Sequence, residues 1–164
     1  MRKLIVSTTI MVICFVSILV GGYKLMNSRT FQLFGDITAK VETNEKVVAL
    51  TFDDGPTENV HEILALLDTY NAKATFFLIG EYIEDFPEEA EAIVQAGHQV
   101  ANHTYSHNRM IFKSPSFIKN EIKKTDQSIR DIGYEGRIDF RPPNGKKIIA
   151  LPWYLHNNNI ETIM

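Results

Sequence analysis

Three groups of polar residues in this chain carry side chains that can bind a metal ion or transfer a proton. Asp53 and Asp54 are adjacent carboxylates, His103 and His107 are imidazoles four residues apart, and Arg141 opens the segment Arg-Pro-Pro-Asn-Gly. Two imidazoles and one carboxylate can bind a divalent metal, and three protein ligands leave positions open for water and substrate. The second carboxylate could then serve as a general base, held by the guanidinium. The residue types therefore predict a catalytic metal site.

Each group also has a simpler explanation when it is considered alone. An Asp pair before Gly55 and Pro56 can form a turn with a helix cap, and an Arg-Pro-Pro segment can be an exposed polyproline-like loop. Because the chain has five His, a pair four residues apart also arises by chance. The catalytic interpretation therefore depends on the three groups meeting in space.

Each of the three groups follows a segment with the pattern of a buried β-strand. Short, nearly continuous apolar runs predict strands at 47–52, 74–79, 100–101, 138–140 and 160–164. Helical periodicity with start and stop residues predicts helices at 60–67, 87–96, 115–132 and 148–157, the last weakened by Pro152. This alternation predicts right-handed parallel βα units, in which the carboxyl ends of the strands open on one face. The three groups are therefore expected to converge on that face.

The N-terminal segment has the length and composition of a membrane-spanning or signal helix. Arg2 and Lys3 precede Leu4–Tyr23, a run without a charged side chain that would rise about 30 Å as a helix, the thickness of a bilayer's hydrocarbon core. No Ala-x-Ala cleavage pattern follows the run, which is also long for a signal, so an uncleaved anchor is favoured over a cleaved signal peptide. We expect a signal anchor or signal peptide at 1–26, a polar spacer with a short first strand at 27–45, and the globular domain at 46–164. The domain would then lie outside the cell, held at the cell membrane by a single span, or secreted if the signal is cleaved.

The overall composition is that of one small globular domain. The chain has 164 residues, and 20 acidic against 17 basic side chains give a formal net charge of −3. This balance lacks the basic excess of a nucleic-acid-binding surface, so no nucleic-acid partner is expected. Since Cys14 is the single cysteine, no intramolecular disulfide can form and the fold must depend on its core. We expect a monomer.

The three groups together resemble the motifs of a known family. Thr51-Phe52-Asp53-Asp54-Gly55-Pro56 resembles the first motif of the polysaccharide deacetylases, the NodB-type enzymes of carbohydrate esterase family 4. His103-Thr104-Tyr105-Ser106-His107 resembles their second motif and Arg141-Pro142-Pro143-Asn144-Gly145 their third, in the same order and with similar spacing. The resemblance runs from about Val47 to the C-terminus. It implies an α/β fold, namely a distorted (β/α) barrel, and metal-dependent removal of acetyl groups from N-acetylated cell-wall or chitin-like glycans.

The resemblance also implies a role for each matching residue. Asp54, His103 and His107 would bind the metal, with zinc as the first choice and cobalt or nickel as alternatives. Asp53 would be the general base, and Arg141 would pair with it and keep it ionised.

Other residues of the motifs would contact the substrate. The backbone N–H of Asn144 would donate to the oxyanion; many members of the family carry an aromatic residue at this position, so the groove wall is expected to differ. Pro142, Pro143 and Tyr105 would contact the glycan, which is expected to be a peptidoglycan or chitin oligosaccharide.

Two further motifs of the family, an Asp/Trp element and a Leu-x-His element whose His protonates the leaving amine, are absent. Leu155-His156 lies too early in the predicted fold, so we interpret His156 as a surface residue, and His61 and His98 also have no motif role. The barrel is therefore expected to be incomplete at the C-terminus, as in a truncated copy, with 160–164 as an unpaired apolar edge. The alternative function is that of a catalytically impaired remnant that only binds metal or glycan.

Overall fold

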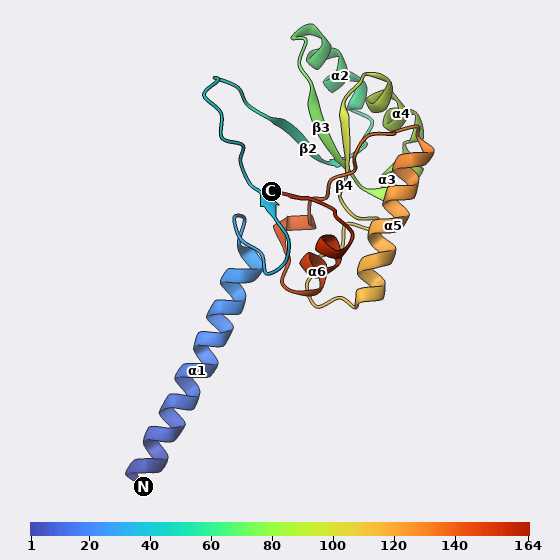
Figure 1. Ribbon diagram of the computed structural model, residues 1–164. Helices are drawn as coiled ribbons and strands as arrows, with labels where there is room; N and C mark the ends of the chain where they lie inside the picture. Colours follow the sequence, from blue (N-terminus) through green and yellow to red (C-terminus); the bar gives the residue numbers. More distant parts are fainter.

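The computed structural model describes residues 1–164 as a long N-terminal helix followed by an α/β domain (Figure 1). Helix α1 (Arg2–Asn27) is long and apolar enough to cross a membrane, and none of its residues is buried. The other elements are β1 (Ile37–Thr38), β2 (Leu50–Gly55), α2 (Val60–Thr69), β3 (Ala74–Leu78), α3 (Gly80–Asp85), α4 (Pro87–Gln95), β4 (Gln99–Asn102), α5 (Pro115–Asp131), the 3-10 turn η1 (Pro143–Gly145), α6 (Ala150–Asn157) and β5 (Thr162–Ile163).

All strand pairs in the domain are parallel. Strands β2, β3 and β4 pair in that order, and β5 pairs with β1. Phe140 connects the two groups through single bridges to Asn102 and Thr162, so the spatial order is β2, β3, β4, Phe140, β5, β1. The sheet is not closed into a barrel, because β2 and β1 have no strand on their outer sides.

The helices cover one side of this sheet, and the core lies between them and the strands (Figure 1). One cluster packs β3 and β4 against α2, α3, α4 and α5, with Phe76, Leu78, Ile93, Val100 and Ile129 at its centre. A second cluster packs Phe140 against α5 and α6, through Ile118, Ile122, Leu151 and Leu155. Both clusters use α5, which makes this helix the main support of the strands that carry the second and third motifs.

The opposite face of the sheet is open. A groove of about 730 Å³ lies between Thr51, Thr75 and Phe77 of the sheet and the segment 39–49. The prediction of a strand at 47–52 that is buried on both faces is therefore wrong: β2 begins at Leu50, and Val47 is 63% exposed. The reason is that β2 is an edge strand, and one of its two faces borders the open groove.

The predicted unpaired edge at 160–164 is also wrong. Ile37 and Thr38 pair with Thr162 and Ile163, because the segment before the domain folds back onto the sheet as β1. The predicted strand at 138–140 is reduced to isolated bridges at Phe140, and α3 begins at Gly80, where only the end of a strand was expected.

Other elements agree closely with their sequence signals. Helix α5 begins after Ser114, whose hydroxyl accepts a hydrogen bond from the N–H of Phe117 at 3.2 Å, as its N-cap position predicts. Gly97 and Gly133 follow α4 and α5 with φ of +70° and +86°, the left-handed conformation that glycine adopts without strain. Helix α6 retains Pro152 in its first turn, where the missing N–H removes no helical hydrogen bond.

The segment after η1 packs against the end of α1. Lys147 is 1% exposed; its ammonium donates to the carbonyl of Ser28, and its N–H donates to the carbonyl of Met26 at 3.4 Å. Burial, and to a smaller extent the nearby charge of Arg29, lowers the pKa of Lys147 to about 8. Lys147 thus contacts the carboxyl end of α1, and its charged form loses hydration free energy there because the side chain is buried.

This burial predicts a pH-dependent stability. Between about pH 8 and 10.5 the unfolded chain, with an ordinary lysine pKa, binds more protons than the folded chain, so stability rises with pH. We expect the free energy of unfolding to increase by about 1 kcal/mol from pH 7 to pH 9, and Lys147→Met to remove that increase. Urea unfolding of the full chain in detergent micelles at pH 7, 8 and 9 measures this free energy for both proteins. Equal increases in both proteins would contradict the assignment.

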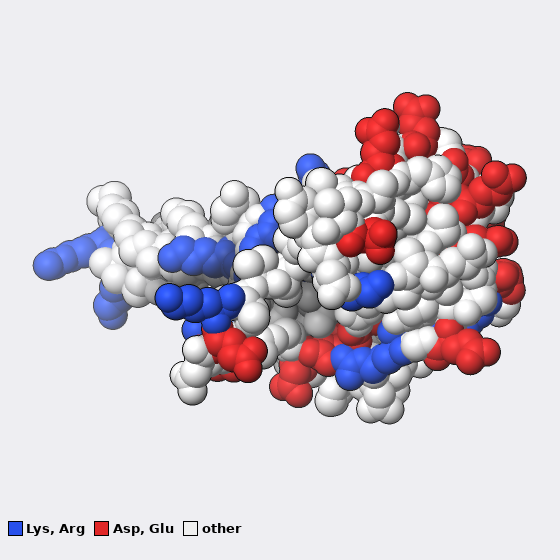
Figure 2. Space-filling view, turned by 90° about the horizontal axis from the view of Figure 1, so that it is seen from above, with Lys and Arg blue, Asp and Glu red and all other residues white.

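Charged side chains are unevenly distributed over the molecule. Figure 2 shows Lys and Arg gathered toward the end that carries α1, while Asp and Glu predominate at the other end of the domain. The sequence agrees, because no acidic residue precedes Asp36.

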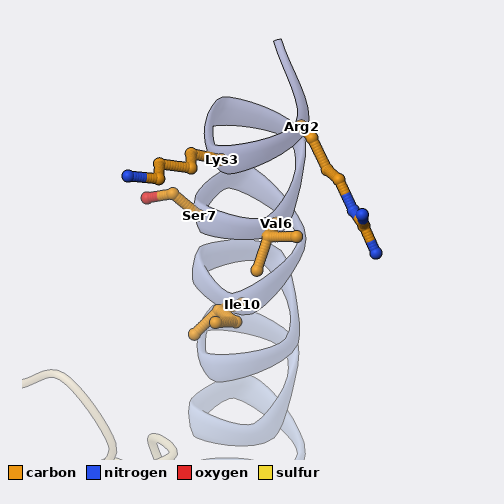
Figure 3. A pocket seen from close by; sticks show the side chains of 5 residues that line it. All are labelled: Arg2, Lys3, Val6, Ser7 and Ile10. Atoms are coloured by element: carbon orange, nitrogen blue, oxygen red, sulfur yellow. The ribbon is translucent and has the colours of Figure 1, made fainter.

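A hollow of about 610 Å³ also lies along the first turns of α1, lined by Arg2, Lys3, Val6, Ser7 and Ile10. All five side chains belong to one helix, and Arg2 and Lys3 extend to opposite sides of it (Figure 3). The hollow is therefore the open surface of a single helix and not a cleft between elements.

Candidate metal centre

Asp54, His103 and His107 meet at the carboxyl edge of the parallel strands. Asp54 lies in β2, and both histidines follow β4. Oδ1 of Asp54 is 3.3 Å from Nε2 of His103 and 3.1 Å from Nε2 of His107, and one donor atom of each residue lies within 4.8 Å of the others. Two segments far apart in the sequence thus present three ligand atoms to one point, as the parallel topology predicts.

The hydrogen bond of His103 fixes which ring nitrogen is free. Nδ1 of His103 is 2.7 Å from the carbonyl of Arg141, and since a carbonyl can only accept, Nδ1 carries the proton. Nε2 is then the nitrogen with a free lone pair, and it faces Asp54. Burial is the largest influence on the pKa of His103 and lowers it, with the charge of Asp53 the main opposing influence. The neutral imidazole, the form that binds metal, is therefore favoured.

The backbone around these residues is in an unusual conformation. Asp54, Thr104, His107 and Asn144 have φ of 63°, 72°, 53° and 56°, in the left-handed region that residues other than glycine rarely adopt. Such strain persists only where neighbouring contacts hold it, and it concentrates at functional sites.

Asp53 lies beside these three residues and is held by Arg141. Nη1 of Arg141 donates to Oδ1 of Asp53 at 2.6 Å and to the hydroxyl of Thr51 at 3.0 Å. The guanidinium carbon is also 3.9 Å from the ring centroid of Phe77, a cation–π contact that fixes its plane. Arg141 thereby orients His103 through its carbonyl and Asp53 through its side chain.

The remaining predicted site residues are more dispersed. Pro142 and Pro143 are buried, whereas Asn144 is exposed at the tip of the turn. The hydroxyl of Tyr105 donates to Glu84 of α3 at 2.7 Å, and the ammonium of Lys124 lies 3.4 Å from the centroid of its ring. The ring of Tyr105 is therefore engaged by α3 and α5.

Sequence reasoning missed several residues that support the site. Thr51 and Phe77 hold the guanidinium of Arg141, and Glu121 of α5 holds Ser106 between the two histidines. Glu121 had a detectable signal, because it lies between Ile118 and Ile122 on the apolar face of the predicted helix, where a carboxylate needs a partner.

The three residues fit a divalent metal by both chemistry and spacing. Zinc is commonly bound by imidazole nitrogen and carboxylate oxygen at about 2.0–2.2 Å in a tetrahedron, which places two ligands about 3.3–3.6 Å from each other. The separations of 3.1 and 3.3 Å lie near the lower end of that range. The group is open to solvent on one side, where substrate could enter. The side chain of Asp54 is 58% exposed, whereas that of His103, on the inner side, is 3% exposed.

The protein is thus an α/β domain that carries two His and one Asp at the carboxyl edge of a parallel sheet. A paired Asp and Arg lie beside these three residues. A family model described as "Polysaccharide deacetylase" matches residues 40–162, three quarters of the chain. The chain therefore belongs to the polysaccharide deacetylase family.

Relatives with assigned activities are similar over most of this chain. A peptidoglycan-N-acetylglucosamine deacetylase of Bacillus cereus is 43% identical over 118 residues, covering 70% of this chain and 42% of the relative. The peptidoglycan-N-acetylmuramic acid deacetylase PdaC of Bacillus subtilis is 37% identical over 107 residues, covering 64% of this chain and 23% of the relative. The chain thus spans less than half the length of these two relatives.

Solved structures support the same fold. The Bc1960 peptidoglycan N-acetylglucosamine deacetylase superposes with a TM-score of 0.69 at 37% identity, covering 73% of this chain and 56% of that one. BA3943 of Bacillus anthracis, described as a CE4 family pseudoenzyme, has a TM-score of 0.73 at 29% identity, covering 80% of this chain and 47% of that one. The expected NodB-type α/β fold is confirmed, with a sheet that does not close into a barrel.

Proposed function

We propose that this chain is a metal-dependent hydrolase that removes acetyl groups from N-acetylated sugars of a cell-wall or chitin-like polysaccharide. The observation that carries the proposal is the meeting of Asp54, His103 and His107 beside the paired Asp53 and Arg141. The named activities of the relatives support peptidoglycan as the substrate class.

In this proposal, Asp54, His103 and His107 hold a divalent metal, zinc by preference with cobalt or nickel as alternatives. When bound there, such a metal lowers the pKa of a water ligand and polarises the acetyl carbonyl. His103 contributes as a neutral ligand, since its Nδ1–H donates to the carbonyl of Arg141 and leaves the lone pair of Nε2 free.

Asp53 is the proposed general base. Its Oδ1 already accepts from Arg141, and Oδ2 is left to take the proton of the attacking water. The hydrogen bond from the guanidinium of Arg141 holds the carboxyl group of Asp53 in one orientation. The N–H of Asn144 is the proposed donor to the oxyanion that forms on the acetyl group, a contribution typically worth about 2.7–4 kcal/mol. Pro142, Pro143 and Tyr105 are the proposed glycan contacts.

We further propose that α1 is an uncleaved anchor or a signal helix, with the domain outside the cell. Residues 1–26 would form that helix, 27–45 the spacer and 46–164 a deacetylase domain that acts as a monomer. The apolar length of α1 supports its proposed role as a membrane-spanning or signal helix.

Acetate release tests the proposal. The full chain, loaded with zinc in detergent micelles, is expected to release acetate from acetylated chito-oligosaccharide or from peptidoglycan. Acetate release should stop when a chelator removes the metal and should recover when zinc is added back. The alternative is a protein that binds metal or glycan without turnover, and the likeness to a pseudoenzyme is the observation that raises it. Saturable zinc binding by folded protein without acetate release would support that alternative and reject the hydrolase.

A further inference from the structure

Glu121 is a carboxylate on the buried face of α5. It lies on α5 between Ile118 and Ile122, which are 0% and 1% exposed, and it is itself 8% exposed. A buried carboxylate is strongly destabilised unless its oxygens are hydrogen-bonded. The hydrogen bonds that Glu121 makes must therefore offset the cost of burying its carboxylate.

Both oxygens of Glu121 bind a single residue, Ser106. The N–H of Ser106 donates to Oε2 at 2.9 Å, and the hydroxyl of Ser106 lies 3.0 Å from each oxygen. None of the ion pairs in the structure includes Glu121. The carboxylate is thus fully committed to the loop that runs from His103 to His107.

The loop needs such support because of its backbone. Thr104 and His107 have φ of 72° and 53°, and neither residue is glycine. Near the start of the loop, the N–H of Thr104 donates to Oδ1 of Asn102, whose amide in turn donates to the carbonyl of Ile122 on α5. Near its other end, the residue directly before His107 is held by Glu121. Helix α5 therefore holds the loop at two points.

The two histidines depend on different supports. His103 is fixed by its own contacts, since its ring bonds to the carbonyl of Arg141 and its N–H donates to the carbonyl of Leu78 at 2.9 Å. The ring of His107 shows a polar contact only to Asp54, the other candidate ligand. The position of His107 is therefore set by its backbone, and so by Ser106.

We propose that Glu121 is a positioning residue for the metal centre, which places His107 within reach of the ion shared with Asp54 and His103 by holding Ser106. This inference rests on the proposed function only in assuming that the three residues bind a metal. It does not require that the chain turn over a glycan.

Zinc affinity of the full chain, measured by competition with a chromophoric chelator, tests the inference. Removing a group that is hydrogen-bonded directly to a metal ligand typically weakens metal binding 10–100-fold. Because Glu121 acts through Ser106, the neighbour of His107, Glu121→Ala is expected to raise the zinc Kd by about tenfold, the lower end of that range. Glu121→Gln keeps an oxygen for the N–H of Ser106 and is expected to restore the affinity to within about threefold of the unchanged chain. Glu91→Ala, at an exposed position of α4, is the matched control and should leave the Kd unchanged.

Two further measurements separate positioning from a general loss of structure. The visible spectrum of the cobalt-loaded chain reports ligand number, and it should change in Glu121→Ala and return in Glu121→Gln. If Glu121→Ala folds poorly, Ser106→Ala is the second variant, and it should weaken zinc binding less than Glu121→Ala does. In the double variant Glu121→Ala/Ser106→Ala the two effects on the zinc Kd should not add.

The outcomes are distinct. A Kd within twofold of the unchanged chain in folded Glu121→Ala, or a lowered melting temperature with unchanged Kd and cobalt spectrum, overturns the positioning role. Absence of zinc binding by the unchanged chain overturns both this inference and the metal-dependent function. Zinc binding that weakens as expected, in a chain that releases no acetate, supports the positioning role and rejects only the catalytic proposal.

Discussion

Asp53→Asn is expected to lower kcat for acetate release by about 10²–10⁴-fold, the usual contribution of a general base. The amide cannot accept a proton, but its oxygen can still accept the hydrogen bond that Arg141 donates at 2.6 Å, so the geometry around the site should persist. Because Asp53 is not among the three clustered ligands, zinc affinity should change little. Acetate release at saturating zinc gives kcat, and chelator competition gives the zinc Kd.

The control for this variant is Asp68→Asn, which removes a carboxylate from an exposed position of α2. It should retain full activity. If Asp53→Asn keeps more than a tenth of the activity of the unchanged chain, another group takes the proton and the assignment of the base fails. If it loses zinc as well as activity, Asp53 is a ligand and the roles of the two adjacent carboxylates must be exchanged.

His107→Ala is expected to weaken zinc binding by about 10²–10³-fold. Zinc sites with four ligands have apparent binding free energies of about 10–16 kcal/mol, so one ligand contributes about 2.5–4 kcal/mol of that total. His107 suits this test because its side chain is 33% exposed and its removal leaves no core cavity, whereas His103 is 3% exposed. Chelator competition measures the affinity, and thermal unfolding without metal checks that the variant is folded.

His61→Ala is the matched control, since His61 is exposed on α2 and outside the group of three candidate ligands. Its zinc Kd should equal that of the unchanged chain. Full zinc affinity in the double variant His103→Ala/His107→Ala would mean that zinc binds elsewhere, and the metal centre would have to be abandoned.

Local signals in the sequence were enough to predict much of the fold. The apolar run 74–79 became β3, Pro87 and Gly97 bracket α4, and Ser114 caps α5, because each signal acts through contacts within one or two turns of chain. The apolar run at 47–52 misled because burial of a strand depends on what lies beside it. Val47 lines a groove, Leu50 is 41% exposed, and β2 is an edge strand.

The sequence by itself determined which chemical groups this protein has and that each group lies near the carboxyl end of a strand or of a strand-like segment of a parallel sheet. That was sufficient to predict that Asp54, His103 and His107 converge, since parallel strands end on one face. Only the tertiary structure decided how they are held: the carbonyl of Arg141 on His103, and Glu121 beneath Ser106. It also decided that β1 covers the edge of β5. The physical reason is that these contacts join residues distant in sequence, and their geometry depends on packing and register, which no local pattern encodes.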